Sequence, residues 1–196
     1  FTDFRYEEQA KQEVGDCATL SVFKTTQTDA FVEFLKTAGY SKLGIEGGLS
    51  VELYESLKTK TENKIEFQIS KSLVAESRKI KDSYELETIR SAFEISDKAF
   101  KKLMKYIKPG LQEKDIAAKL EYYMATLGSE KPSFDTIVAS GHRAACPHAK
   151  PTDKIAVTGE MIKIDFGAVY KGYHSDMTRT IFLGDPDEKF VKVYTT

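Results

Sequence analysis

The most informative part of the sequence is the stretch Lys163-Ile164-Asp165-Phe166-Gly167-Ala168-Val169-Tyr170-Lys171-Gly172-Tyr173-His174-Ser175-Asp176-Met177-Thr178-Arg179-Thr180. It predicts two antiparallel strands, residues 161–169 and 173–183, joined by a tight turn. If the turn centres between Tyr170 and Lys171, Asp165 lies directly opposite Asp176, with Cβ atoms about 5 Å apart. Because strand side chains alternate between faces, a one-residue shift would spoil this pairing.

Two facing carboxylates repel each other unless a proton, a cationic side chain or a metal ion lies between them. One interpretation is therefore a divalent metal site with Asp165 and Asp176 as oxygen ligands. The other is a solvated hairpin whose acids pair with Lys163, Lys171 or Arg179. The spacing of the residues leaves both interpretations open.

The loop before the hairpin, residues 140–153, contains Cys146-Pro147-His148. His148 is a candidate proton donor or hydrogen-bonding group beside the acid pair, and the alternative is a loop histidine that binds only backbone groups. A nucleophile–base pair of Cys146 and His148 is disfavoured because no third residue is in place to orient it. His174 shares the predicted strand face of Asp176, so it is a candidate lining residue.

The first eighty residues read as a small α/β layer. A helix over 29–38 begins at Asp29 as its cap and ends at Gly39, and Ser50 caps a second helix that reaches about residue 58. Strands are expected at 42–46 and 64–69. The charged stretch near Lys79–Asp82 predicts a domain boundary.

Helices dominate the part between this boundary and the loop. A long amphipathic helix ends at Pro109-Gly110, and a second helix over 112–127 is closed by Gly128. A strand is expected at 134–139, and a final helix begins at Asp185 as its cap. The apolar face of the long helix is expected to consist of Leu86, Ile89, Phe93, Phe100, Leu103 and Ile107.

Composition and charge limit the function classes. The chain has 196 residues, 29 Lys and Arg against 30 Asp and Glu, and a net charge of -1, which gives no electrostatic case for nucleic acid or an anionic membrane as partner. No apolar run reaches the roughly 18 residues of a membrane span, and no signal peptide opens the chain. Since two cysteines cannot form a disulfide framework, we expect a cytoplasmic protein.

Four stretches resemble the pita-bread metallopeptidases, which include Xaa-Pro dipeptidase (prolidase), aminopeptidase P and methionine aminopeptidase. Residues 164–168 and 172–180 closely resemble the metal-binding signature of the family, with both Asp residues at matching spacing. Residues 134–141 followed by Pro147-His148 look like the segment that supplies the substrate-side histidine of the family. Residues 80–90 resemble the linker and first catalytic helix of the Xaa-Pro branch, and residues 1–77 resemble a creatinase-type N-terminal domain, which methionine aminopeptidases lack.

The resemblance implies an α/β protein with a creatinase-like N-terminal domain over 1–78 and the first part of a pita-bread catalytic domain over 79–196. It implies two divalent metal ions held by Asp165 and Asp176, and substrate contacts from Phe134, His148 and His174, with His148 also catalytic. The oxygen-rich ligand set favours Mn²⁺ or Co²⁺, with Zn²⁺ or Fe²⁺ as alternatives. One further His and two Glu complete this site in the family, C-terminal to the hairpin, so the present residues alone are expected to be inactive.

The implied activity is cleavage of the Xaa-Pro bond at the N-terminus of dipeptides or short peptides by a homodimer. The alternatives are a metal-free hydrolase related to creatinase and an inactive pita-bread module that binds protein. The chain begins at Phe1 without Met, and a predicted helix starts about ten residues before the sequence stops. We therefore expect the sequence to be part of a longer polypeptide.

Overall fold

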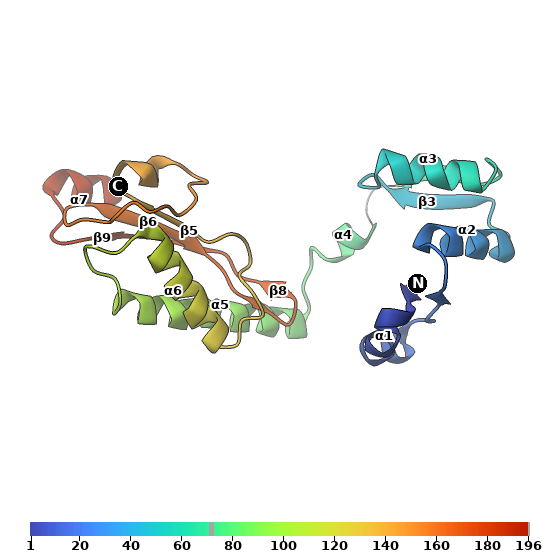
Figure 1. Ribbon diagram of the computed structural model, residues 1–196, viewed down its shortest axis with the longest axis horizontal. Helices are drawn as coiled ribbons and strands as arrows, with labels where there is room; N and C mark the ends of the chain where they lie inside the picture. Colours follow the sequence, from blue (N-terminus) through green and yellow to red (C-terminus); the bar gives the residue numbers. More distant parts are fainter. Residues whose placement is uncertain (71–72, 196) are drawn as a thin grey trace. The chain divides into compact units, whose positions relative to one another are not determined.

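The computed structural model describes residues 1–70 and 73–195 and divides into two compact units, one over Phe1–Ile80 and one beginning at Lys81 (Figure 1). In the parts of the chain that are described, no helix combines the length and the apolar character needed to cross a membrane.

The first unit contains two small parallel sheets. Strand β1 (Thr2–Asp3) pairs with β2 (Val22–Phe23), and β3 (Lys42–Glu46) pairs with β4 (Glu66–Ser70). The helices of this unit are α1 (Glu7–Val14), α2 (Gln27–Ala38), α3 (Val51–Lys60) and α4 (Leu73–Ser77), with short 3₁₀ turns at Phe4–Tyr6 and Gly15–Cys17.

Local signals placed most ends of α2 and α3 correctly. Ser50 caps α3 through a hydrogen bond from the Leu53 backbone N–H, 3.2 Å, and Gly39 ends α2 with a φ of 70°. The prediction that Asp29 caps α2 is wrong, because Thr26 is the cap and its hydroxyl accepts from the Asp29 backbone N–H. Asp29 lies three residues inside the helix, where an acid stabilises the first turn.

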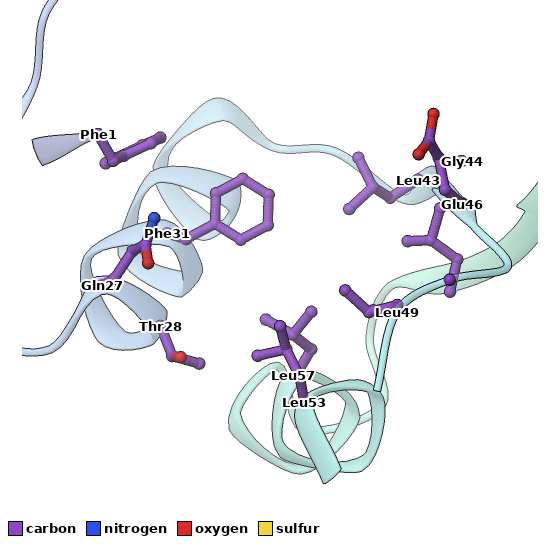
Figure 2. A pocket seen from close by; sticks show the side chains of 12 residues that line it. Phe1, Gln27, Thr28, Phe31, Leu43, Gly44, Glu46, Leu49, Leu53 and Leu57 are labelled. Carbon is purple, nitrogen blue, oxygen red and sulfur yellow. The ribbon is translucent and has the colours of Figure 1, made fainter. Parts of the chain in front are cut away.

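An apolar pocket of about 700 Å³ lies between α2, α3 and β3. Figure 2 shows the side chains of Phe31, Leu43, Leu49, Leu53 and Leu57 around this space. Among the described residues that line it, Glu46 alone carries a carboxylate, so this lining offers mainly apolar contact.

The second unit packs two helices against one face of an antiparallel sheet. The sheet has the order β5 (Ile137–Ser140), β6 (Met161–Phe166), β9 (Met177–Phe182), and α5 (Ser83–Met104) and α6 (Glu113–Thr126) cover one side of it (Figure 1). A two-stranded extension, β7 (Val169–Tyr170) with β8 (Tyr173–His174), continues the hairpin. The core contains Ile162, Ile164 and Phe166 from β6.

The predicted apolar face of α5 is confirmed in part, because Leu103 is fully buried and Phe100 packs against the core, but two other predicted members are not buried. Leu86 and Phe93 are 47% and 40% exposed. The buried positions are instead mostly small residues, which let the helix lie close to the sheet: Thr88, Ala92, Ile95, Ser96, Ala99 and Leu103. Hydrophobicity alone did not identify the small residues of this face, because the close approach selects side chains by size as well as polarity.

The ends of two later elements also differ from expectation. Helix α7 (Glu188–Tyr194) is capped by Asp187, which accepts from the Phe190 backbone N–H at 2.6 Å, so the prediction of Asp185 as cap is wrong. Strand β5 begins at Ile137 rather than at residue 134. Phe134 to Thr136 therefore lie in the approach to the sheet.

Candidate metal and substrate site

The turn of the hairpin sets the register of the two acids. Lys171 and Gly172 occupy the turn with φ of 48° and 75°, and Tyr170 pairs with Tyr173. Two positive φ values are the requirement of a type I′ turn, whose twist matches that of the flanking strands. The predicted turn centre between Tyr170 and Lys171 is therefore wrong by one position.

This turn places Asp165 opposite Thr178, so the predicted direct pairing of Asp165 with Asp176 is wrong. The error is a shift of two residues along one strand, which preserves the face that a strand residue occupies. Asp176 is two residues from Thr178, and diagonal neighbours on one face lie about 7–8 Å apart. The Thr178 hydroxyl donates to Asp165 Oδ1 at 2.8 Å.

A break in both strands orients Asp176. Regular pairing is interrupted beside Gly167 and Ser175, and a Cβ atom at Gly167 would lie 1.9 Å from the Ser175 carbonyl oxygen. The buried Ser175 hydroxyl accepts from the Ala168 backbone N–H at 2.9 Å and lies 2.8 Å from the Ser96 hydroxyl on α5. Ser175 therefore anchors the strand to α5, and the next residue, Asp176, is exposed.

The acids lie on the face of the sheet that α5 and α6 leave open. Ile162, Ile164 and Phe166 are fully buried toward the helices, whereas the alternate residues Lys163 and Asp165 are half-buried. Because successive strand side chains point to opposite faces, Lys163 and Asp165 share the open face.

A pocket of about 450 Å³ on the second unit brings together four of the five predicted site residues. Phe134, His148, Asp165 and Asp176 all line it. The fifth, His174, is exposed on β8 opposite Val169 and is not among the lining residues. Sequence reasoning missed the other lining residues, which are Asp135, Thr136, Ile137 and Lys150.

Among the described residues, the two hairpin acids of this pocket, Asp165 and Asp176, have no Lys or Arg partner. Within residues 1–70 and 73–195, no Lys or Arg nitrogen lies within 4.0 Å of a carboxylate oxygen of Asp165 or Asp176. Arg179 lies instead 3.9 Å from Asp97, and Lys163 binds backbone carbonyls. The interpretation of the hairpin as a set of ion pairs is therefore contradicted for the described residues.

The donor set fits part of a metal site. Carboxylate oxygens suit hard and borderline divalent cations, and two of them that line one pocket without forming an ion pair among the described residues favour a positive ligand. In the described part of the chain, no cluster of three or more His, Cys, Asp and Glu side chains is placed to hold a metal ion. The two carboxylates alone are fewer than the three or more ligands of a protein metal site.

One polar group beside the pocket lacks a partner. The Thr136 side chain is 4% exposed, and its hydroxyl forms no hydrogen bond among the described residues. Thr136 precedes Ile137, which pairs with Asp165 across the sheet. A buried hydroxyl without a partner is uncommon and indicates an unfilled polar contact beside the carboxylate.

A buried carboxylate that sequence reasoning did not single out supports the loop that carries His148. Glu113, at the start of α6, is 0% exposed and accepts from the backbone N–H groups of Ser140 and Thr152 at 2.8 and 3.1 Å and from their hydroxyls. Burial by itself raises the pKa of Glu113, but the hydrogen bonds from Thr152 and Ser140 outweigh it and leave the pKa below its ordinary value. Arg143 adds an ion pair at 3.2 Å.

Comparison with known proteins assigns a family to each part of the chain. Residues 87–196 match the metallopeptidase family M24, and residues 1–80 match the creatinase/prolidase N-terminal domain. The chain is 43% identical over 187 residues to an Xaa-Pro dipeptidase of Pyrococcus furiosus, covering 95% of this chain and 52% of that protein. It therefore spans about half the length of the curated relatives it matches.

Two solved structures are similar over nearly the whole chain. An Xaa-Pro dipeptidase from Bacillus anthracis has a TM-score of 0.92 at 36% identity, covering 98% of this chain and 54% of that one. An X-Pro aminopeptidase from Thermotoga maritima has a TM-score of 0.86 at 36% identity, covering 99% of this chain and 55% of that one.

Proposed function

Because this chain belongs to the metallopeptidase family M24 and carries the creatinase/prolidase N-terminal domain, we propose that the natural protein hydrolyses Xaa-Pro bonds at the N-terminus of dipeptides or short peptides. The family implies divalent metal ions in general terms. The named relatives are Xaa-Pro dipeptidases and an X-Pro aminopeptidase, so both substrate lengths remain within the proposal.

In this proposal Asp165 and Asp176 are ligands of two divalent metal ions, Mn²⁺ or Co²⁺, with Zn²⁺ or Fe²⁺ as alternatives. When bound, such ions supply an activated water nucleophile near neutral pH and polarise the scissile carbonyl. The Thr178 hydroxyl, donating to Asp165 Oδ1, holds that carboxylate in orientation.

The protein side chains recognise and protonate the substrate. His148 hydrogen-bonds the substrate carbonyl oxygen and helps the proline nitrogen to leave protonated. Phe134, half-buried beside it, provides apolar contact for the proline ring, which lacks an N–H and is recognised by shape. His174 would contact substrate only at the rim, since it lies outside the lining of the pocket.

One observation carries the proposal: Asp165 and Asp176 line the same pocket as His148, and neither carboxylate has a Lys or Arg partner in the described ranges. Asp165 is half-buried and Asp176 is exposed, so both carboxylates can be ionised and available to a divalent cation in the pocket. Their position beside an imidazole matches the requirements of metal-assisted hydrolysis.

The first prediction concerns Asp176. In the natural protein supplied with Mn²⁺, Asp176→Asn should lower kcat/KM for Ala-Pro about 1,000-fold and reduce the bound metal, because one ligand oxygen is lost. Kinetics and elemental analysis of the purified protein measure the two effects together.

The matched control is Asp115→Asn, which changes an exposed acid on α6 of the same unit and should leave both readouts unchanged. Full Ala-Pro cleavage and unchanged metal content in the Asp176→Asn protein would refute the proposal. In the unaltered protein, bound metal without cleavage of either Ala-Pro or a longer Xaa-Pro peptide would instead favour a protein-binding module, and cleavage without metal would favour a metal-free hydrolase.

A further inference from the structure

The segment that carries His148 has no regular secondary structure but is held on both sides. Residues 146–148 and residue 150 are exposed, and the segment follows the 3₁₀ turn Gly141–Ala145. On one side Lys163 Nζ donates to the carbonyl oxygens of Cys146 and Pro147, the latter at 3.1 Å. On the other side Arg143 Nη2 donates to the Lys150 carbonyl oxygen at 2.7 Å.

The Lys163 side chain connects this segment directly to the strand of the metal site. Lys163 lies on β6 two residues before Asp165, so both side chains leave the same face of the sheet. Its ammonium group, with three donors, binds two consecutive carbonyls instead of the carboxylates nearby. The two residues it binds are those that immediately precede His148.

On the other side of the segment, Arg143 is held by the buried carboxylate of Glu113. Arg143 Nε lies 3.2 Å from Glu113 Oε2, and its side chain is only 28% exposed. Glu113 is fully buried and bound by four further donors from Ser140 and Thr152. This end of the segment is therefore tied to the start of α6.

We propose that Lys163 is a positioning residue that fixes the His148 imidazole over the carboxylates of Asp165 and Asp176, with Arg143 holding the opposite side of the segment. This inference rests on the proposed function, in which His148 contacts the substrate. Two fixed points flanking one exposed residue restrict its backbone, and small displacements of a catalytic group reduce rate strongly.

The test uses the natural protein with Mn²⁺ and the dipeptide Ala-Pro. Lys163→Met should lower kcat about tenfold with a smaller change in KM and unchanged bound metal and Tm, because the fold keeps its core while the imidazole loses its fixed position. Lys163→Arg, which can still donate to both carbonyls, should restore most of the rate. Lys101→Met removes an exposed lysine of α5 with the same loss of charge and should have no effect.

A double-mutant cycle separates positioning from a general effect. If Lys163 acts through His148, Lys163→Met should cause no further loss of kcat in a His148→Ala protein. Equal losses in both backgrounds would overturn the proposal, and so would wild-type kcat in Lys163→Met.

A measurement independent of activity distinguishes failure of this proposal from failure of the proposed function. The chain contains three histidines, so His142 and His174 serve as internal references for the imidazole NMR signals of His148. Shifted or broadened His148 signals in Lys163→Met but not in Lys163→Arg would support the positioning role, even in a protein that does not cleave Ala-Pro. Unchanged His148 signals would overturn it whatever the activity.

Discussion

The two units of this chain place their buried groups very differently. The first unit buries four hydrophobic side chains among its described residues, Val32, Leu35, Leu57 and Ile65, and leaves an apolar pocket of about 700 Å³ open between its helices and strands (Figure 2). The second unit closes its core around β6 and α5 and also buries a carboxylate, Glu113, with a full set of donors.

The two units also differ in which contacts fix the positions of their residues. The ion pairs of the first unit, such as that of Lys42 with Glu66, are exposed and contribute little free energy. In the second unit the hydrogen bonds of Glu113 connect segments far apart in sequence, and the close approach of Gly167 to Ser175 fixes the two strands of the hairpin. Those contacts orient Asp176 and the segment that carries His148. The most closely constrained backbone of the second unit therefore lies beside the candidate site.

The largest expected effect compares two glycines. Gly167→Ala places a Cβ atom 1.9 Å from the Ser175 carbonyl oxygen, so the second unit should lose about 4 kcal/mol of unfolding free energy. Gly44→Ala on β3 meets only Ser70 Oγ at 3.8 Å and should change the first unit by less than about 0.5 kcal/mol. Hydrogen exchange of the β6 and β3 amides measures the unfolding free energy of the second and first units separately. Equal protection in both variants would show that the strands separate beside Gly167 at no cost.

A pair of acids gives the next largest effect. Glu113→Gln removes the buried carboxylate that pairs with Arg143. It also places an amide N–H₂ group against the donors of Ser140 and Thr152, so the second unit should lose about 3 kcal/mol of unfolding free energy. Glu66→Gln removes an exposed partner of Lys42 and should cost the first unit about 0.3 kcal/mol. The same exchange measurement applies, and a loss below about 1 kcal/mol for Glu113→Gln would contradict the importance of the buried network.

The pH dependence of the second unit follows from the same residue. Because the pKa of folded Glu113 lies below its ordinary value of 4.5, the carboxylate contributes stability that is fully present above pH 4.5. This contribution is lost as the pH falls through the lower folded pKa. When the pH is lowered, the hydrogen-exchange protection of the β6 amides should therefore fall in the unaltered protein by more than in the Glu113→Gln protein. An equal fall in the two proteins would assign the loss of protection to other groups.

The smallest effect compares two buried hydroxyls. Thr61 in the first unit donates to the Leu57 carbonyl oxygen at 2.8 Å, so Thr61→Val should cost about 1 kcal/mol. Thr136 beside the candidate site has no hydrogen-bond partner among the described residues, so Thr136→Val should be neutral within about 0.5 kcal/mol. A loss for Thr136→Val as large as that for Thr61→Val, again by hydrogen exchange, would mean that the hydroxyl has a bound partner in solution.

The sequence by itself determined what depends on near neighbours. Ser50 as the cap of α3 and Gly39 as the end of α2 are local signals, since caps act within about four residues. Asp165, Asp176 and His148 were chosen as candidates from the hairpin and the loop before it, and the structure places all three around one pocket. The face shared by the two acids survived an error of two residues in register, because strand side chains repeat with a period of two.

Tertiary structure decided what depends on contacts between distant segments. The hydrogen bond between Ser175 and Ser96 holds the hairpin against α5 across a separation of 79 residues. The network around Glu113 and the hold of Lys163 on the carbonyls before His148 join residues that no periodic pattern connects. Such contacts require the backbone to be folded first, because their donors and acceptors are brought within about 3 Å only by the packing of the sheet, the helices and the loop.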